Sequence, residues 1–164
     1  MNDAARPVLV ILCGVSFAGK TTLGRALALA RGWEFVSFDE LHGQSQPQIA
    51  SLLAAGRSVV YDDVNRWRSQ RDGLRALAKE QGATACIVHV DTSVDEARQR
   101  WLLNQRQPTR NHVRPGDFLG ILAQFQPPLH GEPVIRYHPK MPFERWVARA
   151  FPPGEPPSIG MWSC

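Results

Sequence analysis

Short runs of apolar residues alternate along the chain with longer segments in which apolar residues recur every three or four positions. The runs are typical of buried strands, and they fall at residues 7–13, 33–38, 57–61, 84–90 and 133–137. The periodic segments predict helices at residues 20–31, 47–55, 68–81, 93–105, 116–125 and 142–151. Because strands and helices alternate, we expect a mostly parallel five-stranded sheet with helices on both faces, a three-layer α/β/α sandwich.

Several predicted helices also carry residues that commonly mark a helix end. Gly82 follows the helical segment 68–81, and glycine often ends a helix. Ser93 and Glu96 have the spacing of a capping box, and Pro142 suits the first position of the last helix. These signals support the helix assignments independently of the apolar pattern.

Length and composition favour a single folded domain. A chain of 164 residues with 43% hydrophobic content can bury one substantial core, which we place in residues 1–151. The proline-rich residues 152–164 predict a tail that is either loose or docked. No apolar run approaches about 18 residues and no secretory leader is evident, so we expect a cytoplasmic protein without a membrane partner.

The net charge and the cysteine content say little about the function. The net charge of +4 would suit an anionic partner, but the basic residues are scattered, and ATP alone is anionic enough to account for part of it. The three cysteines have no metal-binding spacing and predict reduced structural thiols; they are Cys13, Cys86 and Cys164.

The strongest chemical signal lies between the first strand and the first helix. Residues 14–21 match G-x-x-x-x-G-K-[ST], the phosphate loop of P-loop NTPases. Glycines at 14 and 19 allow backbone N–H groups to converge on phosphate, Lys20 would bridge the β- and γ-phosphates, and Thr21 would ligate Mg²⁺. The predicted ATP contacts are Gly14, Ser16, Phe17, Ala18, Gly19, Lys20, Thr21 and Thr22. The alternative is an ordinary glycine-rich turn.

An acid follows the second predicted strand. Ligands of parallel α/β sheets bind at the carboxyl ends of the strands, which is where Asp39 is expected. Its carboxylate could accept the proton of an acceptor hydroxyl and orient the oxygen for in-line attack on ATP. The alternative is that Asp39 caps a helix, and Glu40 could share or take either role.

Two further acids follow the third predicted strand. Asp62 and Asp63 stand where a Walker B carboxylate would contact Mg²⁺ directly or through water. Successive residues of a strand point to opposite faces, so only one of the two acids can face the metal. The sequence pattern does not show which one. Both could instead belong to a simple turn.

Arginines follow the capped helix at intervals of four, with prolines between them. Pro108 and Pro115 argue against one continuous helix through Arg106, Arg110 and Arg114. We therefore expect a lid at about residues 104–116. Arg106 and Arg110 are the candidates to stabilise transferred charge as catalytic residues. A solvated charged connection is the alternative.

The chain resembles the kinase domain of polynucleotide 5′-hydroxyl kinases over most of residues 8–126. The similar segments are the phosphate loop, residues 38–40, residues 63–65 followed by Arg71, residues 74–82, residues 90–91 and the basic lid. The resemblance extends to zeta-toxin-type kinases, chloramphenicol phosphotransferase and seryl-tRNA kinases. It implies an ATP–Mg²⁺ site, a base at Asp39 and a lid arginine near Arg106.

One position departs from the polynucleotide kinases. Their acid after the second strand is followed three residues later by an arginine that handles substrate phosphate, whereas this chain has His42. The loop also shares its Ser-x-Ala-Gly-Lys core with chloramphenicol phosphotransferase. A nucleic acid 5′ end and a small molecule therefore both remain candidate acceptors.

Two classes of function are compatible with these residues. The first is an ATP-dependent kinase that transfers the γ-phosphoryl group to a hydroxyl, which the loop, Asp39 and the lid favour together. The second is an accessory ATPase that acts as a nucleotide-dependent switch. The acceptor pocket is expected to be formed by residues 41–48, the lid and residues 127–139. These segments are rich in loops, and the sequence does not determine their shapes.

Overall fold

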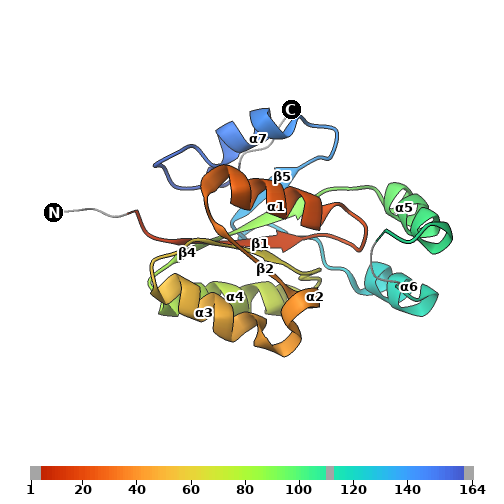
Figure 1. Cartoon of the computed structure of the whole chain (residues 1–164), viewed down its shortest axis with the longest axis horizontal. Helices are drawn as coiled ribbons and strands as arrows, with labels where there is room; N and C mark the ends of the chain where they lie inside the picture. The colour runs from red at the N-terminus through yellow and green to blue at the C-terminus, as the bar shows by residue number, and fades with distance from the viewer. Residues whose placement is uncertain (1–4, 110–112, 161–164) are drawn as a thin grey trace.

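Five parallel strands form the centre of the structure, a computed structural model that describes residues 5–109 and 113–160 (Figure 1). The strands are β1 (Val8–Cys13), β2 (Glu34–Ser37), β3 (Val59–Asp62), β4 (Thr84–Val90) and β5 (Val134–Tyr137). Their order in the sheet is β2-β3-β1-β4-β5, and every neighbouring pair is parallel. The carboxyl ends of the strands consequently meet at one edge of the sheet.

Helices cover both faces of the sheet (Figure 1). α1 (Lys20–Arg31) and α7 (Phe143–Ala150) lie on one face, and α3 (Ser45–Ala54) and α4 (Arg68–Glu80) lie on the other. The remaining elements project from the end at which the strands finish: α2 (Phe38–Leu41), η1 (His42–Gln44), α5 (Val94–Arg106) and α6 (Pro115–Gln124). The predicted three-layer α/β/α sandwich with a parallel five-stranded sheet is confirmed.

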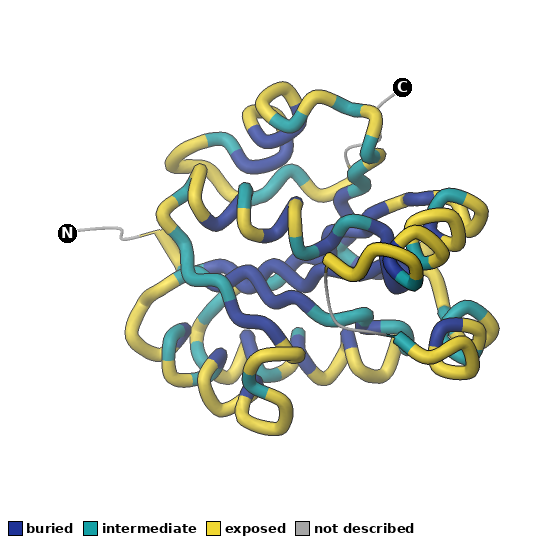
Figure 2. Tube along the Cα trace, turned by 45° about the vertical axis from the view of Figure 1, so that its right-hand side comes forward, coloured by how far each residue is buried: buried dark blue, intermediate teal, exposed yellow. Residues whose placement is uncertain are grey.

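Strand β1 shows why the sheet is buried on both sides. All six of its residues are buried, and they alternate between two apolar clusters. Val10 and Leu12 pack on the side of α1 and α7, whereas Leu9 and Ile11 pack on the side of α3 and α4. The buried strands form the centre of the molecule in Figure 2. A rigid sheet therefore fixes the positions of the loops that leave its carboxyl edge.

The boundaries of the predicted elements lie within two residues of the observed ones, and helix 20–31 and strand 84–90 have the predicted bounds. Phe38 was expected to end a strand but begins α2, a short helix that the pattern did not predict. The pairing of β2 with β3 ends at Ser37 and Asp62, so Phe38 has no ladder to join. Pro142 precedes the first residue of α7 as its N-cap.

The described part of the tail is docked. Backbone N–H groups of Ser158 and Gly160 donate to the carbonyls of Ala150 (2.9 Å) and Val134 (3.0 Å). The chain thus returns from α7 to the start of β5. None of the helices in residues 5–109 and 113–160 has the length and apolar character needed to span a bilayer.

Two of the three cysteines can be placed. Cys13 and Cys86 are buried and unpaired, as expected for reduced thiols, whereas Cys164 lies outside the described residues. Burial raises the pKa of the Cys86 thiol to about 12, so this thiol stays protonated at neutral pH.

Candidate active site

The phosphate loop joins β1 to α1 and has the backbone that its glycines predict. Gly19 has φ of 101°, a left-handed conformation that favours glycine. A Cβ at Gly14 would stand 3.1 Å from the carbonyl oxygen of Val90, so the neighbouring strand leaves little room for a side chain. Phe17 also has positive φ, at 65°, although it is not glycine. The loop is therefore a constrained turn at the N-terminus of α1.

The two polar residues that open α1 are held by specific partners. The Lys20 ammonium donates a 2.9 Å hydrogen bond to the carbonyl of Val15, within the loop itself, and Lys20 is buried. The Thr21 hydroxyl donates a 2.6 Å hydrogen bond to Oδ2 of Asp62. The structure thus connects the phosphate loop directly to the end of β3.

Asp62 and Asp63 have different surroundings. Asp62 ends β3 and is buried beside Thr21. The carboxylate of Asp63 instead accepts hydrogen bonds from the Val64 N–H (2.7 Å) and the Tyr61 hydroxyl (3.3 Å). Burial raises the pKa of the Asp63 carboxyl, although its hydrogen bonds and Lys20 oppose the shift. Asp62 is therefore the acid that lies against the phosphate loop.

Asp39 does not cap a helix. The N-cap position of α2 belongs to Ser37, and Asp39 lies exposed in the first turn. Glu40 is engaged elsewhere, because its carboxylate forms a 2.8 Å ion pair with Arg25 on α1. His42 has an edge contact with the Phe38 ring, at 6.2 Å between centroids, and does not line the cavity described next. Asp39 is the acid of α2 that faces this cavity.

One cavity of about 340 Å³ brings most of the predicted site residues together. The phosphate loop, Lys20 and Thr21 form one side, and Asp39, Asp62 and Asp63 are also in its wall. The remaining lining residues come from α2, the loop after β3, α4, the segment before α6, and α6; they are Phe38, Val64, Asn65, Arg66, Gln70, Val113 and Ile121. Of the regions expected to form the acceptor pocket, only the lid contributes.

Helices α5 and α6, which flank the predicted lid, pack on the phosphate loop through an aromatic stack. The Phe118 ring of α6 lies parallel to the Trp101 ring of α5, at 4.8 Å and 8°, and meets the Phe17 ring edge-on at 6.2 Å. The Trp101 indole N–H donates to the carbonyl of Val113 at 2.9 Å. The stack therefore connects the phosphate loop to one wall of the cavity.

The two predicted lid arginines that the structure describes do not line the site. Arg106 is exposed on the last turn of α5 and lines neither the cavity above nor the second one described below. Arg110 lies outside the described residues, and Arg114 is the exposed N-cap of α6. Their predicted catalytic roles remain predictions.

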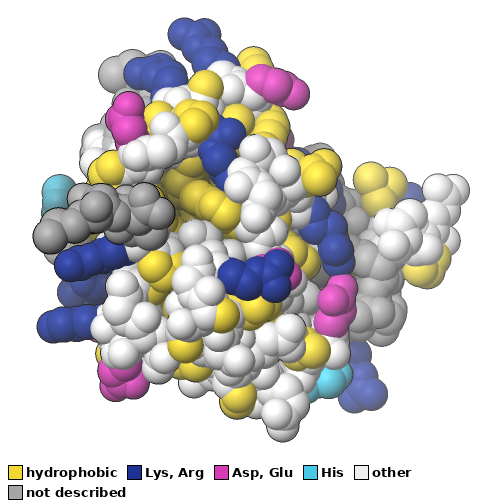
Figure 3. Space-filling model, turned by 60° about the vertical axis from the view of Figure 1, so that its left-hand side comes forward, with side chains coloured by type: hydrophobic (Ala, Val, Ile, Leu, Met, Phe, Trp, Pro, Cys, Tyr) yellow, Lys and Arg dark blue, Asp and Glu magenta, His cyan; other side chains and the backbone are white. Residues whose placement is uncertain are grey.

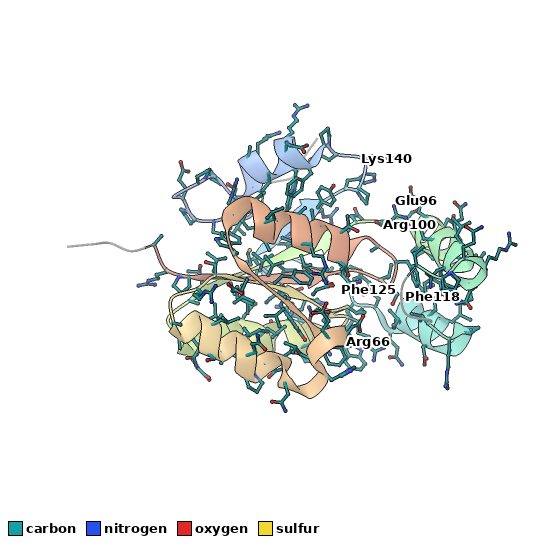
Figure 4. The ribbon with its side chains drawn as sticks, viewed as in Figure 1. Arg66, Glu96, Arg100, Phe118, Phe125 and Lys140 are labelled. Carbon is teal, nitrogen blue, oxygen red and sulfur yellow. The ribbon has the colours of Figure 1, made fainter. Side chains whose placement is uncertain are left out.

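Arg100 is a residue that the sequence reasoning missed. Its guanidinium donates to the carbonyls of Phe17 (3.1 Å) and Ala18 (3.2 Å), and the Thr92 hydroxyl also donates to Ala18, at 2.6 Å. Arg100 lines a second cavity, of about 460 Å³, on the other side of the loop, together with Tyr137. Figure 4 labels Arg100 on α5 and Lys140 in the segment after β5. The sequence signal that could have drawn attention to Arg100 was its position in the helix that follows β4, at the carboxyl edge of the sheet.

The loop after β3 is fixed by a buried cluster. Asn65 has positive φ, 47°, and its side-chain amide donates to the Leu12 carbonyl at 2.7 Å. The guanidinium of Arg71 donates to the Asn65 carbonyl at 2.9 Å and forms a buried ion pair with Glu132 at 2.8 Å. Asn65 and Arg71 were noticed only through a resemblance, and their structural role explains why both polar residues are buried.

Comparisons with known proteins agree with this geometry. A family described as AAA domain matches residues 41–128. The gluconokinase of Gluconobacter oxydans (strain 621H) is 29% identical, over 87% of this chain and 90% of its own. The shikimate kinase of Actinobacillus pleuropneumoniae serotype 5b (strain L20) is 25% identical, over 75% of this chain and 80% of its own.

A solved structure shows the same fold. The gluconokinase from Sinorhizobium meliloti 1021 superposes with a TM-score of 0.66 at 23% identity, covering 87% of this chain and 88% of its own. The family match spans more than half of the chain and includes the acids after β3 and the lid region. The chain therefore belongs to the AAA domain family of P-loop kinases, and it is an ATP-dependent phosphotransferase that acts on a hydroxyl acceptor.

Proposed function

We propose that this kinase transfers the γ-phosphoryl group of ATP to a hydroxyl group of a small molecule. The observation that carries the proposal is the cavity of about 340 Å³, because it holds the phosphate loop and Asp39 in one space. Ligand cavities typically range over about 300–1,000 Å³. This one must also admit the γ-phosphate, so the space beside Asp39 suits a compact acceptor.

The two cavities suggest how ATP lies. They share Phe17 and Gly19 of the phosphate loop, so a nucleotide whose phosphates follow the loop can extend from one cavity to the other. The second cavity would then receive the nucleoside, between Arg100 and the ring of Tyr137. An arginine and an aromatic ring can both stack on a base.

A magnesium ion fits beside the loop. The Thr21 hydroxyl and an oxygen of Asp62 are 2.6 Å apart, and oxygen is the donor that Mg²⁺ prefers. No group of three His, Cys, Asp or Glu residues suited to a metal occurs in residues 5–109 and 113–160, so phosphate and water would complete the ligand set. Bound there, Mg²⁺ would offset the negative charge on the β- and γ-phosphates.

Asp39 is proposed as the base. It lies in the first turn of α2 at the cavity wall, and the neighbouring Glu40 is paired with Arg25. Its carboxylate would accept the proton of the acceptor hydroxyl and hold the oxygen toward the γ-phosphate. Lys20 would bind the phosphates, and closure of the lid would bring in a charge from Arg106 or Arg110.

A small acceptor is favoured over a nucleic acid 5′ end. Relatives that align over most of the chain are named gluconokinase and shikimate kinase. A polynucleotide acceptor would bind through several phosphate contacts, which needs clustered basic side chains. On the face that Figure 3 shows, which is on the side of the N-terminus and away from the carboxyl edge of the sheet, Lys and Arg side chains are spread between acids and other residues.

The test follows the label of γ-labelled ATP in the presence of Mg²⁺. Gluconate, shikimate and a 5′-hydroxyl oligonucleotide would be offered separately, with Asp39→Asn as the base variant and Lys20→Ala as the loop variant. We expect label on a small acceptor, a loss of about 10²- to 10⁴-fold in turnover for Asp39→Asn, and retained ATP binding. Lys20→Ala should lose ATP binding as well.

The other outcomes have clear meanings. Label on the oligonucleotide alone would replace the proposal with a polynucleotide kinase. Label released only as phosphate with every acceptor would favour the accessory ATPase. Unchanged turnover in Asp39→Asn would remove Asp39 from the mechanism.

A further inference from the structure

We propose that Arg66 selects acceptors that carry an anionic group, a carboxylate or a phosphate, in addition to the hydroxyl that is phosphorylated. The inference rests on the proposed function and names the class of acceptor. Arg66 lies in the loop after β3, three residues beyond Asp63, and lines the same cavity as Asp39 and Lys20. Figure 4 shows it at the edge of the sheet where α2 and α6 project.

The other charged groups in the cavity already have tasks. Lys20 and Thr21 would contact the phosphates of ATP, and Asp39 is the proposed base. Asp62 accepts a hydrogen bond from Thr21, and Asp63 accepts hydrogen bonds from Tyr61 and the Val64 N–H. Lys20 and Arg66 are the two cations among the described lining residues. Lys20 is needed at the nucleotide, which leaves Arg66 as the positive charge for the acceptor.

The guanidinium of Arg66 is free to bind an anion at its edge. Its central carbon lies 4.2 Å from the centre of the Trp67 ring, so the aromatic ring covers a face of the group. Guanidinium donors lie in the plane of the group, and stacking leaves them available. Within residues 5–109 and 113–160, no carboxylate forms an ion pair with Arg66.

The backbone that carries Arg66 is held from both sides. Its carbonyl accepts a 2.8 Å hydrogen bond from the N–H of Gln126, which follows α6 closely. The side chain of Gln126 accepts a 3.0 Å hydrogen bond from the N–H of Arg68. On the other side, Asn65 is fixed by Leu12 and by Arg71. A fixed backbone limits where the guanidinium can reach, which favours one acceptor geometry.

The geometry of arginine also sets the chemistry. Its planar fork pairs with the two oxygens of a carboxylate or phosphate through two parallel N–H···O bonds, whereas a single hydroxyl oxygen does not match both arms of the fork. The acceptor would then be gripped at two points, with its anionic group on Arg66 and its reacting hydroxyl on Asp39. Such two-point binding orients the hydroxyl for attack.

The experiment compares matched acids and neutral compounds. The pairs are gluconate with glucitol, shikimate with its methyl ester, and glycerol 3-phosphate with glycerol, which separates carboxylate from phosphate. Binding to the wild-type protein would be followed by thermal shift and calorimetry with Mg²⁺ and a non-hydrolysable ATP analogue, and turnover by ADP release and by mass spectrometry of the product.

We expect the wild-type protein to prefer one acid over its neutral partner. Arg66→Gln should weaken binding of that acid and raise its KM by roughly 10- to 100-fold, with the KM for ATP nearly unchanged. Arg66→Lys should recover part of the loss, because it keeps the charge without the fork. The matched control is Arg68→Gln, since Arg68 is exposed and faces Asp72 outside the cavity.

Each remaining outcome decides the matter. If no acid is preferred by the wild-type protein, or if Arg66→Gln weakens acids and neutral compounds equally, the assignment of Arg66 is wrong. If an acid binds and its binding needs Arg66, but no phosphorylated product forms, the assignment stands and the proposed kinase reaction on these compounds fails.

Discussion

The Thr21 hydroxyl donates a 2.6 Å hydrogen bond to Oδ2 of Asp62 and so joins the first turn of α1 to the end of β3. The adjacent Asp63 has no such connection to the loop, because its hydrogen bonds go to Tyr61 and to the Val64 backbone. Two neighbouring acids that look equivalent in the sequence therefore have different environments, and of the two it is Asp62 that is hydrogen-bonded to Thr21.

The first prediction separates these two acids. Asp62→Asn should raise the Mg²⁺ concentration required for half-maximal turnover by about 10- to 100-fold, because it removes a charged oxygen beside Thr21. Asp63→Asn should change that concentration little. The measurement is a Mg²⁺ titration of ADP release at fixed ATP, and equal effects of the two variants would contradict the assignment.

The stability of Asp63→Asn provides a second readout. Burial raises the pKa of Asp63 above its ordinary value of 3.8. A raised pKa means that the folded protein holds the proton more tightly, so its contribution to stability is present at low pH and lost as pH rises through the folded pKa. At pH 7 the ionised carboxylate is a cost, and Asp63→Asn should unfold at equal or higher urea concentration than the wild-type protein.

The alternation of strands and helices could be predicted because its cause is local. An apolar run such as 84–90 is buried on both faces, and the ends of helices carry their own signals, as the Ser93 hydroxyl does when it accepts a 3.2 Å hydrogen bond from the Glu96 N–H. The phosphate loop was also predictable, since its glycines and Lys20 are contiguous in the sequence.

The rest of the site depends on contacts between distant segments. The choice of Asp39 over Glu40 requires Arg25 of α1, which engages Glu40. Arg100 could not be recognised because its partners, the carbonyls of Phe17 and Ala18, come from a loop more than 80 residues earlier. Arg-rich segments attract attention through their charge, but distance in space decides which arginine meets the loop.

The second prediction compares the arginines of α5. Arg100→Ala should raise the KM for ATP by roughly tenfold, because it removes a charged group that borders the loop and the proposed nucleoside cavity. Arg106→Ala should lower kcat with a smaller effect on the KM for ATP, if the lid closes over the transferred group. Initial rates over a range of ATP concentrations would measure both.

The roles of the lid arginines can fail independently. Arg106→Ala and Arg110→Ala variants that keep the turnover and ATP affinity of the wild-type protein would exclude the lid as a catalytic element. Arg145 of α7 is exposed and lines neither cavity, so it offers a control substitution to alanine.

The third prediction concerns the wall that Val113 forms. Trp101→Phe should keep the ring stacked on Phe118 but remove the indole N–H that donates to the Val113 carbonyl. The net value of such a hydrogen bond is about 0.5–1.5 kcal/mol, and the Gln105 amide still donates to the Val113 carbonyl at 3.0 Å, so the KM for the acceptor should rise by at most about two- to tenfold, with the KM for ATP unchanged. The matched control is Trp33→Phe, because the Trp33 ring also packs against an aromatic ring, that of Phe151.

A change of the KM for ATP in Trp101→Phe as large as that for the acceptor would show a different role. The aromatic stack would then affect turnover mainly through Phe17 and the phosphate loop, and not through the position of Val113. Circular dichroism would confirm that the variant is folded before the kinetic constants are compared.

The fourth prediction concerns the buried ion pair between Arg71 and Glu132. Both side chains are at most 1% exposed and lie 2.8 Å apart, and Arg71 also donates to the carbonyls of Asn65 and Gln126. Glu132→Gln should cost about 3–5 kcal/mol of unfolding free energy, because it leaves the Arg71 charge buried without its counter-charge. Replacing both residues by apolar ones should cost less than the sum of the single changes.

The dependence on pH identifies the charge as the cause. Burial alone would raise the pKa of Glu132, but hydrogen bonds from Arg71 and from the Leu129 N–H outweigh it and hold the pKa below its ordinary value of 4.5. A depressed pKa gives stability that is present above the ordinary value and is lost as pH falls through the folded pKa. Urea unfolding of the wild-type protein should therefore become easier below about pH 4.5, and the curve for Glu132→Gln should be flatter there. The exposed Glu80→Gln should follow the wild-type curve. If Glu132→Gln keeps the wild-type slope, another carboxylate carries the effect, and the pair contributes to stability through packing alone.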